Sequence, residues 1–366
     1  MLVAYFFGSL NRGGSETLVC DVLRQGDKLP FNAICIYRNE GTMSEDFRNN
    51  CGRLLKLEKK DNWAKYLLKL RRTLIQEKVT IVHAQTSLNA ITAVLCTLFT
   101  NIRVVTTFHG FYFENAPKWK KWIVYKGSKK IAFVSDYMRQ HYIQKGIWGN
   151  IDRYVVVYNG IDFNKFGDIT KRSNSGNKVE MCMVGSFGLT RNQLFVCKFL
   201  ERLNNQGVDF HFTFVGIARK GEEEYLEECM KFCHNQKLDE RVTFAGLRHD
   251  IPSLLKKMDA FVYASRLDTF GIAIIEAAAS GLPTFVNDWG VMDEVTQHGK
   301  FATLYKSNDL DSLCSKFNDF LAHRDEYCSR AIEAAKEIRK TYSIEEHIAT
   351  LNRIYREVCP EKTPSN

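Results

Sequence analysis

Residues 262–284, VYASRLDTFGIAIIEAAASGLPT, determine the fold class of this chain. The β-rich run at 260–263 predicts a strand that ends in a polar turn, and the apolar run 271–280 predicts a helix. Gly281 and Pro283 follow that helix in the order in which they commonly end helices. The stretch therefore predicts a strand followed by a helix, the repeating unit of an α/β sheet.

Two carboxylates stand out in this stretch. Glu276 is the one charged residue within the apolar helix, and Asp268 lies eight residues before it in the loop. A buried carboxylate needs hydrogen-bond donors, and the paired hydroxyls of a sugar can supply two of them. A glutamate that pairs with a cation or with the helix dipole is the alternative interpretation. The position at a strand's carboxyl end, where α/β sheets bind ligands, favours a ligand site.

Length and composition indicate a protein of two α/β domains. The 366 residues exceed one ordinary core, and 45% hydrophobic with 25% charged residues is typical of soluble globular proteins. Eleven cysteines without a CxxC motif predict reduced thiols and give no zinc pattern. No apolar run is long enough to cross a membrane, and the N-terminus resembles a first strand rather than a signal peptide. We therefore expect a cytoplasmic location.

Positive charge is concentrated in the first half of the chain. The net charge is +9, and the excess of basic over acidic residues is confined to residues 1–170. This asymmetry predicts an anionic partner, such as a membrane surface or a phosphorylated acceptor; nucleic acid is not expected, because no recognition motif accompanies the charge. Residues 117–130, PKWKKWIVYKGSKK, form either a solvated helix face or a helix that binds a membrane interface. We assign to the membrane or acceptor side Lys118, Trp119, Lys120, Lys121 and Trp122.

Strand-like and helix-like runs alternate along the whole chain, which predicts two doubly wound parallel sheets. We expect an N-terminal, acceptor-side Rossmann-like domain at 1–166 and a linker at 167–178. A second Rossmann-like domain should follow at 179–342, with an amphipathic helix and tail at 343–366.

Polar or glycine-rich groups follow several predicted strands. In the loop 8–16, Gly13 and Gly14 allow close approach of a ligand, and Ser15 is expected to cap a helix whose N-terminus suits phosphate. His109 follows the strand 103–108 and is either a core histidine or a site residue. The loop 185–193, GSFGLTRNQ, places Arg191 in the first turn of a helix, where a cation opposes the helix dipole unless an anion lies between them.

Taken together, these motifs resemble the retaining glycosyltransferases of family 4, which have the GT-B fold, along nearly the whole chain. The resemblance rests on Gly13-Gly14 with Glu16, FHG at 108–110, NGID at 159–162, MVGSFGLTRNQ at 183–193, RVTFAGLRHDI at 241–251 and DTFGIAIIEAAASGLP at 268–283. The last run matches the family's E-x7-E signature, with Asp268 in the first acidic place. The resemblance implies two Rossmann-like domains that face each other across a cleft and a UDP- or GDP-sugar donor.

The resemblance also implies roles for individual residues. Glu276 should hold the ribose hydroxyls, Arg191 should neutralise the diphosphate, and Asp268 and His109 should lie beside the donor sugar. Catalytic roles are thereby implied for His109, Arg191 and Asp268. The remaining donor-binding residues that it implies are Gly13, Gly14, Gly185, Ser186, Leu247, Arg248, Phe270, Gly271 and Ile272. The terminal helix should cross back onto the first domain.

Two departures from the family pattern concern the donor. Asp268 is one methylene shorter than the usual glutamate, and Ser186 replaces an arginine that normally accompanies the cation at position 191. Bidentate hydrogen bonding by Arg191 can compensate in part. No metal or other cofactor is expected, because Asp309-Leu310-Asp311 is interpreted as a helix N-cap with acids that favour the dipole.

The predicted activity is that of a retaining hexosyltransferase. It would move a sugar from a nucleotide-sugar to a glycan or lipid-linked acceptor in the synthesis of a capsular, O-antigen or exopolysaccharide, on the inner face of the membrane. The alternatives are a GT-B-fold nucleotide-sugar epimerase and a pseudo-transferase that binds nucleotide-sugar without chemistry, for which Ser186 is the support.

Overall fold

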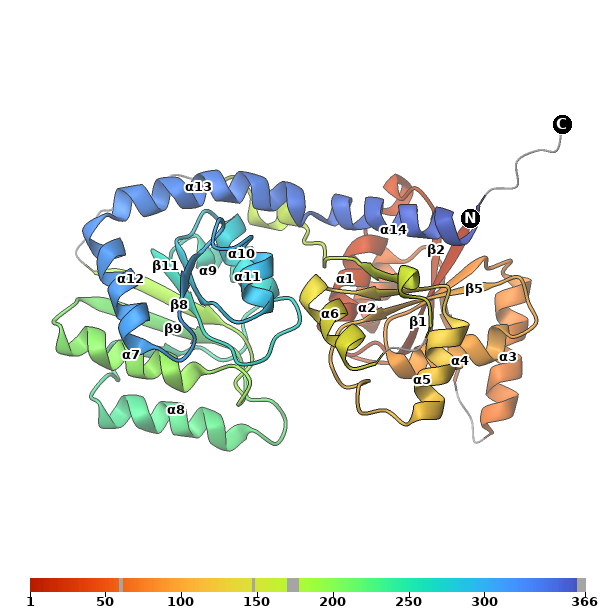
Figure 1. Ribbon diagram of the computed structural model, residues 1–366, viewed down its shortest axis with the longest axis horizontal. Coiled ribbons are helices and arrows are strands. Elements are labelled where there is room, and N and C mark those ends of the chain that lie inside the picture. Colours follow the sequence, from red (N-terminus) through yellow and green to blue (C-terminus); the bar gives the residue numbers. More distant parts are fainter. Residues whose placement is uncertain (59–61, 147–148, 170–177, 361–366) are drawn as a thin grey trace. The chain divides into compact units, whose positions relative to one another are not determined.

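The computed structural model describes residues 1–58, 62–146, 149–169 and 178–360 (Figure 1). The chain forms two compact units: unit 1 contains residues 1–162 and the chain from Ile344 onward, and unit 2 contains residues 163–343. Most of the predicted linker, residues 170–177, and the predicted tail at 361–366 lie outside the described residues.

The described part of unit 1 contains a seven-stranded sheet of order β3-β2-β1-β4-β5-β6-β7, in which all neighbours are parallel. Its strands are β1 (Leu2–Ser9), β2 (Asn32–Asn39), β3 (Leu54–Lys56), β4 (Ile81–Ala84), β5 (Arg103–Phe108), β6 (Lys130–Phe133) and β7 (Tyr154–Val156). This is a doubly wound order that reverses direction beside β1, between β1 and β4.

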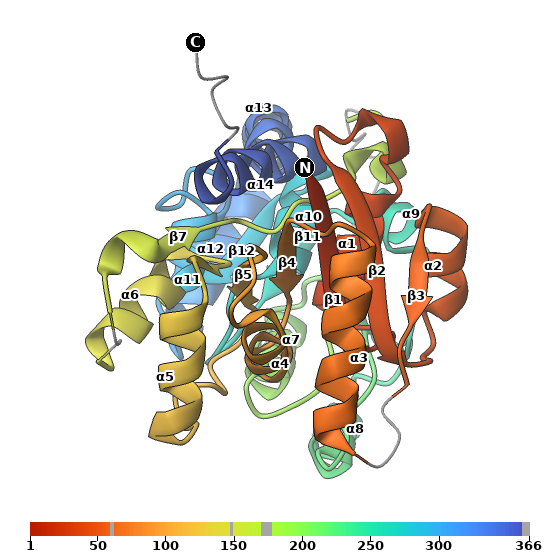
Figure 2. The ribbon, with the colours of Figure 1, turned by 90° about the vertical axis from the view of Figure 1, so that its right-hand side faces the viewer.

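Helices cover both faces of this sheet. They are α1 (Gly14–Leu23), α2 (Ser44–Asn50), α3 (Trp63–Gln76), α4 (Ser87–Thr97), α5 (Lys118–Gly127), α6 (Asp136–Gln144) and α14 (Ile344–Val358), with the 3-10 turns η1 (Gly26–Lys28) and η2 (Ile151–Arg153). Helix α4 packs between α3 and α5, as Figure 2 shows, whereas α1 contacts α2 and α14.

The C-terminal helix is part of the core of unit 1. The predicted apolar face of α14 is buried in one cluster with alternate residues of β1 and with α1, which includes Tyr5, Phe7, Leu18, Ile344, Ile348, Leu351 and Ile354. Tyr355 adds polar contacts: its hydroxyl lies 2.6 Å from Nδ1 of His83, whose Nε2 lies 2.8 Å from the hydroxyl of Thr107. Helix α14 is therefore fixed to β4 and β5 by hydrogen bonds as well as by apolar burial.

The described part of unit 2 contains a six-stranded parallel sheet of order β10-β9-β8-β11-β12-β13. Its strands are β8 (Val179–Val184), β9 (Phe210–Val215), β10 (Val242–Phe244), β11 (Ala260–Tyr263), β12 (Thr284–Asn287) and β13 (Thr303–Tyr305). The order reverses between β8 and β11, so ligand binding is expected at the carboxyl ends of these two strands.

Helices of unit 2 complete the second doubly wound layer. They are α7 (Gln193–Asn205), α8 (Glu223–Asn235), α9 (Ile251–Leu255), α10 (Ile272–Ala279), α11 (Val291–Val295), α12 (Leu310–Ala322) and α13 (Arg324–Thr341), with the 3-10 turn η3 (Phe163–Phe166). Figure 1 shows α7 and α8 side by side, and α10 packs on α13. Asp309 caps α12 by accepting a hydrogen bond from the Ser312 amide, 2.9 Å away, which confirms the N-cap interpretation.

The prediction of two doubly wound Rossmann-like sheets of the GT-B class is confirmed. Strands β3 and β13 were not predicted from the sequence, whereas the equally short β7 and β10 were. None of the helices in the described part of the chain is long and apolar enough to cross a membrane.

Candidate functional site

An ion pair lies at the carboxyl ends of β8 and β11. The guanidinium of Arg191, from the loop after β8, hydrogen-bonds Oδ2 of Asp268, from the loop after β11. The Asp268 side chain is 7% exposed and that of Arg191 is 19% exposed, so water screens the pair only weakly. Two residues predicted to act on one ligand are therefore brought into direct contact.

Further contacts hold the Asp268 carboxylate. The hydroxyl of Tyr263 donates to Oδ2 over 2.7 Å, and Oδ1 accepts the backbone amides of Thr269 (2.8 Å) and Phe270 (3.4 Å). The Arg191 guanidinium also lies 5.3 Å from the centre of the Tyr263 ring. The carboxylate is thus fixed by four donors, as a buried anion requires.

The structure corrects the expected environment of Arg191. Helix α7 begins at Gln193, so Arg191 precedes the helix and does not lie in its first turn. Its amide donates to the carbonyl of Gly188, which closes a turn over 2.8 Å. The anion that the sequence required beside Arg191 is present in the protein itself, as the carboxylate of Asp268.

Glycines allow the loops after β8 and β9 to pass close together. The amide of Gly185 donates to the carbonyl of Val215, and a Cβ on Gly216 would lie 2.1 Å from the Gly185 carbonyl oxygen. A side chain at position 216 is therefore excluded by backbone, and its φ of +147° also favours glycine. The sequence motif identified Gly185 but missed Gly216, although Gly216 also follows directly on a strand.

Side chains and backbone join the Arg191 loop to the Asp268 loop. The carbonyl of Thr190 accepts the Ser265 hydroxyl (3.0 Å) and the Arg266 amide (2.8 Å). Asn287, at the end of β12, accepts the Ser265 amide over 3.0 Å and donates to the Ser265 carbonyl over 2.9 Å. These contacts fix the position from which Asp268 meets Arg191, and sequence reasoning missed Asn287.

A second arginine reaches the same glycine loop. Nε of Arg219, from the loop after β9, donates to the hydroxyl of Ser186 over 3.2 Å, and Nη1 donates to the hydroxyl of Thr190 over 2.6 Å. Ser186 therefore contacts a guanidinium. Arg219 was not predicted from the sequence; a cation three residues after the glycine that follows β9 was the available signal.

Helix α10 begins directly after the loop that carries Asp268. Its N-cap Gly271 has φ +80°, in the left-handed region that favours glycine, and Gly281 after the helix has φ +70°. Phe270 is buried, Ile272 is half-buried, and Glu276 lies half-buried in the middle of the helix. The expected strand, turn and helix around these residues are confirmed.

The loop after β10 carries Leu247 and Arg248 at the surface of unit 2. Leu247 is 59% exposed. Arg248 makes two hydrogen bonds to Asp250, of 2.9 and 2.5 Å. The role expected for these two residues beside a base stays a prediction.

In unit 1, His109 follows β5 as predicted, and its Nε2 lies 2.8 Å from Oε1 of Gln85 at the end of β4. Burial and the nearby His347 lower the pKa of His109 to about 4, so its ring is neutral at pH 7. A neutral imidazole offers a hydrogen bond rather than a charge to a bound group.

The glycines of the first loop behave differently from the expectation. Gly13 is the N-cap of α1 with an extended backbone (φ −156°), which any residue can adopt, and Gly14 is the first helical residue. Ser15 lies inside the helix and donates to Glu16 over 2.8 Å, so the predicted Ser15 cap is wrong. A Cβ on Gly13 would lie 2.6 Å from Oε2 of Glu16, the end of a flexible side chain that can move aside, so neither the backbone nor this contact requires glycine there.

The basic segment forms helix α5, with its two tryptophans at the surface. Trp119 is 59% and Trp122 is 53% exposed, and their spacing places them on one face. Nζ of Lys120 lies 5.4 Å from the centre of the Trp119 ring, Lys121 donates to the Glu114 carbonyl, and Lys118 is exposed. Exposed tryptophans beside lysines are typical of a surface that meets a membrane interface.

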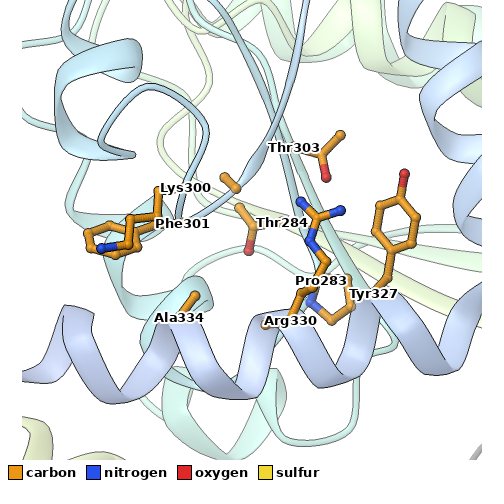
Figure 3. Close-up of a pocket in the computed structure, with 10 residues that line it drawn as sticks. Pro283, Thr284, Lys300, Phe301, Thr303, Tyr327, Arg330 and Ala334 are labelled. Carbon is orange, nitrogen blue, oxygen red and sulfur yellow. The ribbon is translucent and has the colours of Figure 1, made fainter.

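A separate small pocket in unit 2 lies away from these residues (Figure 3). It is lined by the amino-terminal ends of β12 and β13 and by α13, through Pro283, Thr284, Phe301, Thr303, Tyr327 and Arg330. The ion pair lies instead at the carboxyl ends of the strands, so this pocket is no part of the candidate site.

Two doubly wound sheets, one of which holds a fixed glycine loop and an arginine–carboxylate pair at its switch point, define an α/β enzyme of the GT-B class. The comparisons are specific. The model of the glycosyl transferases group 1 matches residues 166–338, and that of glycosyltransferase family 4 matches residues 12–165. The chain belongs to this glycosyltransferase family, which confirms the predicted resemblance and the hexosyltransferase class.

Relatives and solved structures agree with this assignment. The chain is 28% identical over 270 residues, 68% of each protein, to the UDP-Gal:alpha-D-GlcNAc-diphosphoundecaprenol alpha-1,3-galactosyltransferase of Escherichia coli. It is 25% identical to the lipopolysaccharide core mannosyltransferase LpsB of Rhizobium meliloti, over 55% of this chain and 60% of that protein. The fold matches Anabaena Alr3699/HepE in complex with UDP and glucose (TM-score 0.83, 18% identity, 98% and 100% covered).

Proposed function

We propose that this glycosyltransferase moves a hexose from a UDP-sugar to a lipid-linked glycan acceptor, with retention, in the synthesis of a surface polysaccharide. The observation that carries the proposal is the Arg191–Asp268 pair beside the glycine loop at the switch point of unit 2. It provides a cation for a diphosphate and a carboxylate for sugar hydroxyls within one contact. The UDP complexes of the structural relative and the diphosphoundecaprenol acceptor of the E. coli relative support the two substrate classes.

In the proposed reaction the acceptor hydroxyl attacks the anomeric carbon on the face from which the diphosphate departs. The bond from this carbon to the phosphate oxygen breaks while the bond to the acceptor oxygen forms, and the departing oxygen takes the acceptor proton. Arg191 stabilises the charge that develops on the diphosphate. Asp268 orients the sugar, Glu276 holds the ribose, and neutral His109 hydrogen-bonds the sugar.

The proposal places the enzyme at the cytoplasmic face of a membrane. The exposed Trp119 and Trp122 with Lys118 on α5, and the basic excess of residues 1–170, support peripheral binding to anionic lipid near a lipid-linked acceptor.

The test is transfer by the purified protein from a panel of UDP- and GDP-sugars to a polyprenyl-diphosphate-linked sugar, with the anomeric configuration of the product read by NMR. Glu276→Ala should abolish transfer, whereas Asp311→Ala, at a side chain 82% exposed, should not change it. Full activity of the Glu276 variant would refute the site assignment. A changed sugar nucleotide formed without acceptor would indicate the epimerase, and binding without turnover the pseudo-transferase.

A further inference from the structure

Arg219 lies in the loop between β9 and α8, which follows the glycine loop closely. The Arg219 amide donates to the Phe187 carbonyl over 2.9 Å, and the Phe187 amide donates to the Ile217 carbonyl over 2.9 Å. A Cβ on Gly188 would lie 3.1 Å from Cδ of Arg219, so the glycine loop passes directly against this side chain. These contacts place Arg219 beside Phe187 and Gly188, and the Gly188 carbonyl also accepts the Arg191 amide.

The groups that hold the guanidinium of Arg219 in the described part of the chain are neutral. Its two hydrogen bonds go to the hydroxyls of Ser186 and Thr190, of 3.2 and 2.6 Å. Among the described residues, no carboxylate forms an ion pair with it, and its Nη2 makes no hydrogen bond.

A neighbouring acid, Glu222, makes its hydrogen bond to another residue. Glu222 accepts the Leu189 amide over 2.7 Å and lies against Gly188, and it makes no ion pair with Arg219. Arg191, the other cation of the glycine loop, is already paired with Asp268. Of the two guanidinium groups that contact this loop among the described residues, that of Arg191 is in an ion pair and that of Arg219 is in none.

We infer that Arg219 is a donor-binding residue that contacts the diphosphate of the nucleotide-sugar, with Ser186 and Thr190 as the hydroxyls that aim it. This inference rests on the proposed function. The half-buried guanidinium retains N–H donors of Nη2 for phosphate oxygens, and guanidinium–phosphate hydrogen bonds are charge-assisted. In this arrangement the Ser186 hydroxyl aligns the guanidinium of Arg219, which the loop after β9 supplies.

The test measures binding by calorimetry with three probes: UDP, uridine and inorganic pyrophosphate. Arg219→Gln keeps a donor near Ser186 and removes the charge. It should bind UDP and pyrophosphate about tenfold more weakly, the loss expected for one charge-assisted phosphate contact, and uridine unchanged. Arg219→Lys should recover part of the affinity. The matched control is Lys220→Ala, at an exposed neighbour, which should bind all three probes like the parent.

Two results would overturn the inference. The first is that folded Arg219→Gln binds UDP and pyrophosphate within twofold of the parent. The second is that it loses as much affinity for uridine as for UDP, which would indicate a structural role. Thermal melts of Arg219→Gln and Arg219→Ala check that both variants keep the fold. A different result would contradict the proposed function. Pyrophosphate binding that depends on Arg219, in a protein that binds no UDP- or GDP-sugar, would support the anion contact and refute the donor class.

Discussion

Replacement of Asp268 by Asn separates the two effects of the ion pair with Arg191. The substitution keeps the shape and removes one charge. Oδ1 can still accept the amides of Thr269 and Phe270, but the new amide group then faces two donors, the Arg191 guanidinium and the Tyr263 hydroxyl. A cation is left without its counter-ion in a site where water has little access.

The expected loss of stability follows from burial. Removing one partner of a buried ion pair costs roughly 3–5 kcal/mol. The Arg191 side chain keeps 19% of its exposure, so water relieves part of the penalty and we expect about 3 kcal/mol, the lower end of that range. For a unit of this size each kcal/mol lowers the melting temperature by roughly 2–4 °C, so unit 2 should melt about 6–12 °C lower.

Ligand binding should change in the opposite direction. In the parent protein a diphosphate must compete with Asp268 for Arg191, and in Asp268→Asn this competitor is gone. We therefore expect UDP to bind about tenfold more tightly while sugar transfer is lost, because the carboxylate proposed to orient the sugar is absent.

Scanning calorimetry and titration with UDP test both parts. The control is Asp250→Asn, which breaks the arginine–aspartate pair with Arg248 at side chains that are 36% and 53% exposed; water screens this pair, so the melting temperature should stay close to that of the parent. Unchanged melting of Asp268→Asn, or UDP affinity that falls together with transfer, would refute the argument that the two charges compensate each other.

Three other expectations can be checked independently. His83 and His347 are buried with pKa values lowered to about 3 and about 4 by desolvation, so the unfolded chain binds more protons below pH 6.5. The free energy of unfolding of unit 1 should therefore be highest above pH 6.5. It should fall towards pH 4 by up to about 1.4 kcal/mol per pH unit for each histidine. Urea titrations at several pH values should give a smaller dependence of the unfolding free energy on pH for His83→Gln than for the parent. Replacing Trp119 and Trp122 by Ala should reduce co-sedimentation with anionic vesicles severalfold without changing UDP affinity, and equal sedimentation would exclude α5 as the membrane surface. Gly271→Ala should cost about 1–2 kcal/mol in a urea titration, because alanine is strained at φ +80°; an unchanged midpoint would contradict that conformation.

Much of the fold could be predicted because the central strands of both sheets are buried on both faces. Largely apolar runs such as 2–7 and 179–184 mark them, and the observed strands β1 and β8 coincide with these runs within two residues. Strands β3 and β13 were not predicted, and their pairing with β2 and β12 identifies them.

The candidate site was predictable only where a residue's partner is local or its motif is specific. Asp268 was identified because it occupies a signature position. Its pairing with Arg191 was not, because the two are 77 residues apart and their contact depends on the order of β8 and β11. Arg219 was missed for the same reason: its role appears only when the loops after β8 and β9 are adjacent.

Arg191 is paired with a carboxylate and Arg219 with hydroxyls, which predicts that their effects on donor binding are coupled. A diphosphate that approaches the parent protein meets Arg219 with its charge uncompensated, whereas Arg191 must first exchange Asp268 for phosphate. In Asp268→Asn both guanidinia are available, so Arg219→Gln should then weaken UDP binding by clearly less than tenfold. A double-mutant cycle of Asp268→Asn and Arg219→Gln measures this coupling, and strictly additive changes in the free energy of UDP binding would show that the two cations do not act on one anion.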